Sequence, residues 1–136
     1  MTSPTADLKP GLQGHATTVV SDALMAPAVG SGTAAVYATP SMVALMEAAA
    51  VDCIERHLAP GQASLGVHLD VSHTAATPKG LTVSATATLT AIDGRKLTFA
   101  IEARDSMEVI GKALHTRVVV DAARFAAKVA SKTTLA

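Results

Sequence analysis

Aromatic residues are almost absent from this sequence of 136 residues, which has one Tyr, two Phe and no Trp. Proteins that bind single-stranded nucleic acid stack bases on such rings, and proteins that bind the duplex carry an excess of positive charge. Here 11 Lys and Arg residues balance 11 Asp and Glu residues. We therefore expect no nucleic-acid partner.

Cysteine is nearly absent as well. Cys53 is the only one, so no disulfide can form within the chain, as is typical of a reducing compartment. The first residues are polar and lack the apolar stretch of a secretory signal. No apolar run reaches the roughly 18 residues that span a bilayer. These features predict a cytoplasmic protein with no membrane partner.

Metal-binding motifs are also missing. The histidines have no H-E-x-x-H spacing, and there is no pair of cysteines. His68 and Asp70 share one face of a predicted strand, but two ligands do not make a site. We therefore expect no metal and no cofactor.

The length fits one domain, and the 49% of hydrophobic residues can supply a core. Residues 1–10 contain Pro4 and Pro10, which discourage regular structure, so this segment is predicted to be a flexible lead-in. Residues 11–136 are predicted to form the single domain. Because Ala adds little buried area, a copy of the chain could cover a further face.

One long helix is predicted from Thr39 to Ala59. Thr39 is expected to be its N-cap, with Pro40 as the first helical residue, and Pro60 is expected to stop it. Helical spacing places Glu47 among apolar neighbours, namely Val43, Ala50, Val51 and Ile54. A carboxylate in an apolar stripe needs a partner or titrates abnormally, and both cases indicate chemistry.

The rest of the chain shows strand periodicity. A first strand is predicted within residues 14–25, followed by a mobile connection over residues 27–38. After the helix, apolar and polar residues alternate over residues 64–74 and 81–91, then around Leu97 to Ala103 beyond an Asp93-Gly94 hairpin, and over residues 111–120. A short helix capped by Asp121 is expected to pack through Phe125 and Val129. The predicted class is α+β, one long helix against an antiparallel sheet of about five strands.

Two periodicities bring Glu47 and His73 into the same layer. Helical spacing directs Glu47 toward the sheet, and the alternation of Leu65, Val67, Leu69 and Val71 directs His73 toward the helix. A buried carboxylate and an imidazole can divide acid and base roles near neutral pH. A purely structural pair, or a histidine at a strand end, fits the same spacing.

Gly66 interrupts the strand, as glycine does at a bulge or where a ligand approaches the backbone. From the spacing we expect the bulge, with the approach of a ligand as the alternative.

The sequence resembles a known family. The residues that carry the resemblance are the run from Thr39 to Glu47, Ser64-Leu65-Gly66, and the segment from His73 through Val83, with Asp93-Gly94-Arg95 and His115 to Arg117 further on. Together they resemble the hotdog-fold thioesterases related to fluoroacetyl-CoA thioesterase, over about residues 8–132.

The resemblance implies a hotdog fold, in which a sheet wraps the long helix, and a homodimer with active sites at the subunit interface. It implies hydrolysis of an acyl-CoA, with Thr39, Glu47 and His73 as catalytic residues. Gly66 would stabilise the oxyanion through its N–H group, and Arg117 would contact the substrate. CoA would enter only as part of the substrate. The family's aromatic lid is not matched, because Tyr37 is the only aromatic residue between Val29 and Ala38. We therefore expect a more open or differently shaped acyl pocket without fluoroacetyl selectivity.

Two alternatives keep the fold. A hotdog enoyl-CoA hydratase or dehydratase would use the same acid and imidazole to move a proton beside the thioester. A non-catalytic acyl-CoA binding protein would have lost the chemistry together with the lid.

Overall fold

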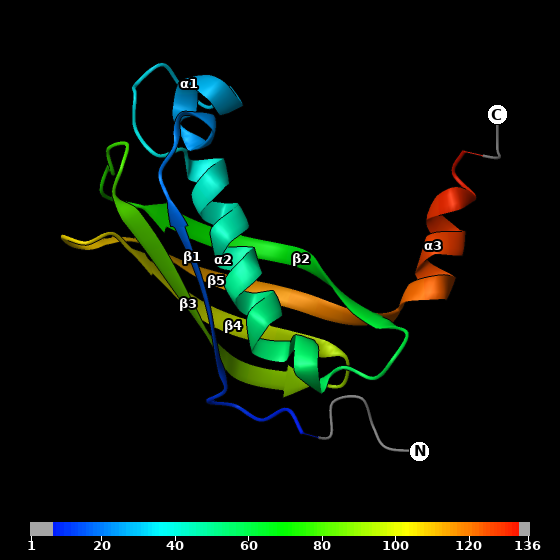
Figure 1. Cartoon of the computed structure of the whole chain (residues 1–136). Helices are drawn as coiled ribbons and strands as arrows, with labels where there is room; N and C mark the ends of the chain where they lie inside the picture. Colours follow the sequence, from blue (N-terminus) through cyan, green and yellow to red (C-terminus); the bar gives the residue numbers. More distant parts are fainter. Residues whose placement is uncertain (1–6, 134–136) are drawn as a thin grey trace.

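The computed structural model describes residues 7–133. Its elements, in chain order, are β1 (Gln13–Val19), η1 (Asp22–Leu24), α1 (Ala26–Val29), α2 (Thr39–Ile54), η2 (Glu55–His57), β2 (Gln62–His73), β3 (Thr82–Asp93), β4 (Lys96–Arg104), β5 (Val109–Asp121) and α3 (Ala122–Ala130). Figure 1 shows α2 lying across one face of a curved sheet. This is the hotdog arrangement, and it confirms the predicted α+β class.

The five strands form one antiparallel sheet in the order β1-β3-β4-β5-β2. β3 and β4 are joined by the predicted hairpin, in which Gly94 has a φ of 61°. β1 and β2 stand at the two ends of the strand order, so each pairs with a single neighbour among the described residues. The free edge of β2 becomes important for the site below.

α2 buries a stripe of mostly small and flexible side chains against the sheet, consisting of Met42, Met46, Ala49, Ala50, Cys53 and Ile54. The helix comes so close to β1 that a Cβ atom added at Gly14 would collide with the backbone of Ala49 and Cys53. Only glycine allows this approach. Apart from Phe99 and Tyr37, the core is aliphatic or sulfur-containing.

Several predicted boundaries differ from the structure. α2 ends at Ile54 rather than near Ala59, and a 3₁₀ turn continues it. β1 ends at Val19, and the connection after it contains the short helix α1. Residues 1–6 of the predicted lead-in lie outside the described residues, whereas Leu8 is 6% exposed and belongs to the core.

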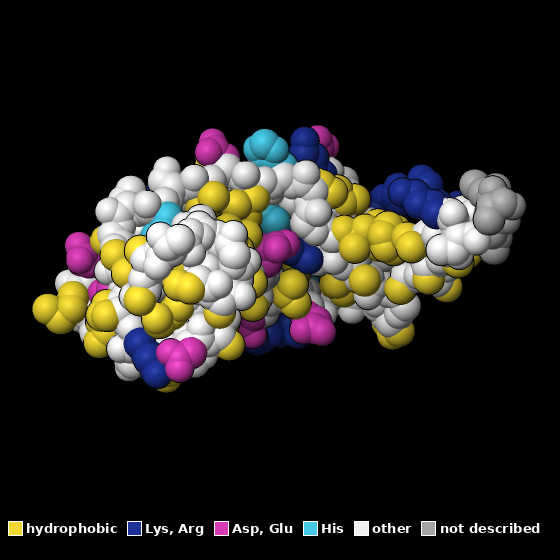
Figure 2. Space-filling view, turned by 90° about the horizontal axis from the view of Figure 1, so that it is seen from above, with side chains coloured by type: hydrophobic (Ala, Val, Ile, Leu, Met, Phe, Trp, Pro, Cys, Tyr) yellow, Lys and Arg dark blue, Asp and Glu magenta, His cyan; other side chains and the backbone are white. Residues whose placement is uncertain are grey.

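α3 corrects another expectation. Asp121 caps it as predicted, accepting a hydrogen bond from the Arg124 N–H at 2.9 Å. The predicted packing through Phe125 and Val129 is wrong, because these side chains are 38% and 48% exposed and α3 buries no residue. Figures 1 and 2 show the helix extending away from the sheet, with basic side chains gathered toward its end. Spacing identified the apolar face of α3, but spacing does not tell what covers such a face.

β2 contains a bulge that strict alternation does not predict. The register shifts between Gly66, which is opposite Arg117, and His68, which is opposite Thr116. Val67 is the extra residue, and it is 58% exposed rather than directed inward. Because directly opposed residues share a face, the shift places Gly66 on the same face as Leu69, which is opposite His115. The predicted assignment of Gly66 and Leu69 to opposite faces is therefore wrong.

Candidate active site

Thr39 lies at the start of α2, and its hydroxyl does not cap the helix. The N-cap is Ala38, in extended conformation, so Thr39 is the first helical residue and the N-cap prediction is wrong by one position. The Thr39 side chain is free to point sideways instead. Its Oγ1 lies 2.7 Å from Nδ1 of His73, the last residue of β2.

His73 is directed toward the helix, as the alternation of β2 predicted. Burial lowers the pKa of its imidazole below the usual 6.5, and the nearby backbone of Ala75 opposes this shift to a smaller extent. The ring is therefore neutral at pH 7. A neutral imidazole that is bonded to a hydroxyl can accept or pass on a proton.

Glu47 has a partner, but it is not the predicted one. Its Oε2 lies 3.2 Å from a guanidinium nitrogen of Arg117 and 3.9 Å from Nε2 of His115. The Glu47 side chain is 41% exposed, so it lies on the flank of the apolar stripe rather than within it. The prediction that His73 is its direct partner is wrong within one chain. Arg117 was missed in this role because nothing in the spacing links two residues so far apart in the sequence.

Arg117 is held by four groups. Its Nε donates to Ser64 Oγ at 2.9 Å, and a terminal nitrogen donates to the Ser64 carbonyl at 3.1 Å. The other terminal nitrogen contacts both Glu47 and, at 3.1 Å, His115 Nε2. A guanidinium with this many contacts has little freedom. The side chain is 8% exposed, so Arg117 is a buried and firmly held partner for the Glu47 carboxylate.

His115 was not singled out by the sequence as a site residue. Its Nδ1 lies 2.8 Å from the carbonyl oxygen of His68 and must donate to it, because a carbonyl only accepts. Its Nε2 then carries a lone pair that accepts from Arg117. Burial lowers the pKa of His115, with the charge of Arg117 contributing in the same direction and the His68 carbonyl opposing. His115 is therefore a neutral ring that orients the guanidinium. Its position two residues before Arg117, on the same strand face, was the available signal.

Gly66 lies directly beneath the carboxylate. A Cβ added there would lie 2.5 Å from Glu47 Oε2 and 3.0 Å from Cε1 of His115. The predicted bulge is confirmed, because Gly66 borders the register shift of β2, and the approach of a ligand to its backbone stays a prediction. On the face of β2 that Glu47 contacts, an atom can approach the backbone of Gly66 directly because no side chain of its own covers it.

The site residues thus fall into two groups at two positions along α2. Thr39 with His73 makes the first, and Glu47 with Gly66, His115 and Arg117 makes the second. Thr39 and Glu47 are eight residues apart, which corresponds to about 12 Å along a helix axis. No hydrogen bond or ion pair within residues 7–133 joins the two groups, and a single small reacting group is too short to bridge this distance.

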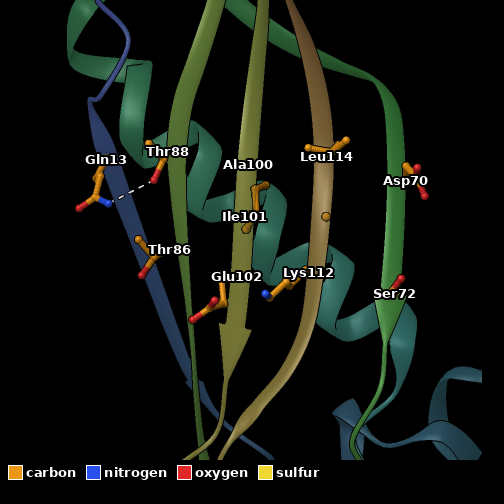
Figure 3. A pocket seen from close by; sticks show the side chains of 11 residues that line it. Gln13, Asp70, Ser72, Thr86, Thr88, Ala100, Ile101, Glu102, Lys112 and Leu114 are labelled. Atoms are coloured by element: carbon orange, nitrogen blue, oxygen red, sulfur yellow. Dashed lines mark hydrogen bonds between the residues drawn. The ribbon is translucent and has the colours of Figure 1, made fainter.

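A pocket of about 460 Å³ opens beside the first group. Its walls are the connection after α1 and the end of β2, and they include Tyr37, Thr39 and His73. A larger hollow of about 630 Å³ lies on the face of the sheet that is turned away from α2. Figure 3 shows this face from the front, with α2 passing behind the strands. Polar side chains such as Thr86, Thr88 and Glu102 line that hollow, and none of the predicted site residues does. The chemistry is therefore assigned to the helix side.

Comparisons with known proteins identify the family. The model of the fluoroacetyl-CoA-specific thioesterase family, FlK, matches residues 20–123. The chain belongs to this family. It is 47% identical to the fluoroacetyl-CoA thioesterase of Streptantibioticus cattleyicolor over 98 residues, which are 72% of this chain and 70% of that protein. By this membership the chain is a thioesterase.

Solved structures agree with this family assignment. A structure of the fluoroacetyl-CoA thioesterase FlK is 37% identical, covers 92% of this chain and 97% of its own, and superposes with a TM-score of 0.87. A thioesterase superfamily member from Thermus thermophilus covers 93% of this chain and 94% of its own, with 23% identity and a TM-score of 0.86, and it supports the hotdog fold. Among residues 7–133 of the present chain, no helix is long and apolar enough to cross a membrane.

Proposed function

We propose that this thioesterase hydrolyses small or medium acyl-CoA thioesters to a carboxylic acid and free CoA, using Thr39, Glu47 and His73. The observation that carries the proposal is the pair of preorganised groups. A hydroxyl and a neutral imidazole lie 2.7 Å apart, and a carboxylate held by a fixed guanidinium rests on a glycine backbone. A relative of this family was solved as a variant with acetyl-CoA bound, at 36% identity and a TM-score of 0.88.

The roles follow from the chemistry of each group. The Glu47 carboxylate attacks the thioester carbon, or it removes a proton from the water that does so. The Gly66 N–H stabilises the negative charge that develops on the carbonyl oxygen. His73, oriented by Thr39, moves a proton to the departing thiolate. Arg117 holds the carboxylate and lies close enough to meet the substrate.

We further propose that two copies of the chain complete each site. The two groups both border β2, which is a free edge of the sheet. An antiparallel pairing of two β2 strands about a point between Leu69 and Asp70 would place Gly66 of one copy opposite His73 of the other. Such a two-fold arrangement is the commonest form of homo-oligomer. It would also bring a hydroxyl–imidazole pair to each carboxylate.

The activity is tested by thiol release over a panel of acyl-CoA esters, with the wild type beside Glu47→Gln and His73→Ala. The proposal expects release by the wild type and a loss of about 100-fold or more in either variant. Absence of thiol release from every ester would refute it. Water addition to crotonyl-CoA would indicate the hydratase alternative, and tight binding without turnover would indicate a binding protein.

The shared site has its own test. When Glu47→Gln and His73→Ala chains are mixed after reversible unfolding, a mixed dimer would have one intact site and one doubly altered site. Random pairing then restores about a quarter of the wild-type activity. If each site were built within one chain, the mixture would stay as inactive as its components.

The route of attack is distinguished by oxygen-18. In a single turnover in labelled water, attack by Glu47 expels the CoA thiolate and forms an anhydride, and attack of water on the Glu47 carbonyl of that anhydride leaves label in the Glu47 carboxylate. Activation of water by Glu47 puts the label only in the acid product.

A further inference from the structure

Tyr37 has an unmatched hydroxyl at the pocket that contains Thr39 and His73. The side chain is 1% exposed, and its Oη forms no hydrogen bond with any described residue. Burial raises the pKa of Tyr37 to about 12, so the hydroxyl keeps its proton and can donate throughout the neutral range. A buried donor without an acceptor is uncommon, because the lost hydration is not replaced.

His73 has the same deficiency beside it. Its Nδ1 is engaged by Thr39, whereas its Nε2 is buried and has no hydrogen-bond partner among the described residues. The two rings meet edge to face, with centroids 6.5 Å apart and planes at 81°. Both residues line the same 460 Å³ pocket. The two unmatched polar atoms are therefore carried by neighbouring side chains that line one pocket.

The chemistry of these atoms limits what can satisfy them. The tyrosine hydroxyl needs an acceptor, and the Nε2 of a neutral imidazole needs a donor or an acceptor according to its tautomer. An sp³ oxygen that carries a proton, as in water or an alcohol, meets both needs. A methyl group or a longer alkyl chain meets neither.

We propose that Tyr37 Oη and His73 Nε2 together bind one hydroxylic oxygen inside this pocket. The inference rests on the proposed function, and it allows two sources for that oxygen. One is the water that hydrolyses the thioester, in which case Tyr37 is a residue of the reaction itself. The other is a hydroxyl substituent on the carbon next to the acyl carbonyl, in which case Tyr37 determines specificity.

Tyr37→Phe is the matching perturbation, because it removes a single oxygen and keeps the buried ring. Thr17→Val is the control, since it also removes one hydroxyl, from an exposed position on β1 away from the pocket. Three substrates separate the sources. Acetyl-CoA has no substituent, whereas hydroxyacetyl-CoA and propionyl-CoA carry substituents of nearly equal size that differ in hydrogen bonding.

If the oxygen is the attacking water, Tyr37→Phe lowers kcat about tenfold on all three esters and leaves KM unchanged. If it is the substituent, kcat/KM falls by about tenfold for hydroxyacetyl-CoA alone. Unchanged values on all three esters would overturn the inference. An equal loss in Thr17→Val would also overturn the inference. A rise in KM on all three esters with kcat unchanged would overturn it as well.

The controls separate this inference from the proposed function and from folding. If the wild type releases thiol and Tyr37→Phe behaves like it, only the inference fails. If the wild type releases none, the proposed function fails. In that case calorimetry measures the ratio of the affinities for hydroxyacetyl-CoA and propionyl-CoA in the wild type and in Tyr37→Phe. The same ratio in both proteins refutes the inference. A purely structural hydroxyl would shift the melting temperature in Tyr37→Phe without lowering kcat or kcat/KM on any ester.

Discussion

A methyl group added at Gly66 is expected to remove activity while leaving the fold intact. The new Cβ would stand 2.5 Å from Glu47 Oε2. Ordinary carbon–oxygen contacts are roughly 3.5 Å, so the carboxylate must retreat by about 1 Å. Glu47 is 41% exposed, and the atom displaced is the far end of a flexible side chain. The chain can therefore accommodate the methyl group without moving its backbone.

The magnitudes for stability and activity differ accordingly. The φ of Gly66 is not in the left-handed region, so alanine is compatible with its backbone and restricts the unfolded chain, which adds about 0.4–1 kcal/mol of stability. The remaining contacts, 3.0 Å from His115 Cε1 and 3.3 Å from a terminal nitrogen of Arg117, offset part of that gain. A catalytic group displaced by about 1 Å costs on the order of 100-fold in rate. We therefore expect a free energy of unfolding within about 1 kcal/mol of the wild type and a loss of kcat of about 100-fold.

Gly14→Ala is the matched comparison. Its methyl group would meet the backbone of α2 at Ala49 and Cys53, which has no freedom to retreat. We expect this variant to lose about 2 kcal/mol or more of stability through overpacking. Denaturant unfolding and thiol release, measured on both variants, test the reasoning. A Gly66→Ala protein that keeps full activity, or one as destabilised as Gly14→Ala, would refute it.

Three further predictions concern the polar contacts. Arg117→Lys keeps the charge but loses the fork that bonds Ser64 twice, so kcat/KM for an acyl-CoA should fall by about 10- to 100-fold; an unchanged value would show that the fork is not needed. Thr39→Val should lower kcat with little change in melting temperature, because the hydroxyl contacts His73 and does not cap α2, while Thr39→Ser should keep most of the activity. Burial lowers the pKa values of His73 and His115, so the unfolded chain binds more protons than the folded chain below pH 6.5. Their contribution to stability is therefore complete above pH 6.5 and declines as the pH falls from 6.5 toward the folded pKa values. Denaturant unfolding between pH 8 and about pH 5 tests this, and a wild type that declines no more than His115→Gln would contradict the assignment to His115.

Local patterns predicted most of the fold because each element has its own period. The alternation of residues 81–91 and the Asp93-Gly94 turn specified β3, β4 and their hairpin. Asp121 marked the start of α3. The register of β2 was not accessible in this way, since Leu65 and Val67 look like two inward residues of a regular strand. The extra residue is revealed only by pairing with β5.

The candidate site was predictable in its members and not in its contacts. Glu47 was noticed as a charge out of place, and Gly66 as a break in a strand. Their actual neighbour, Arg117, is 70 positions from Glu47 in the chain, and only the folded sheet brings them together. Tyr37 carried no signal beyond being the single aromatic residue of its segment, because an unmatched hydroxyl is a property of packing and not of sequence.

The bulge at Val67 shows that the length of β2 matters as much as its composition. If β2 kept all its residues but paired with β5 without the bulge, regular alternation from Leu69 would turn Gly66 away from α2 and direct Leu65 toward it, since a shift of one residue exchanges the two faces. Every side chain with chemistry would still be present, yet the carboxylate would rest against leucine rather than against a bare backbone. Homologous strands should therefore be aligned by counting residues between the glycine and the histidine. A relative that keeps both but has one residue fewer between them should place the glycine on this same face with a regular strand and no bulge.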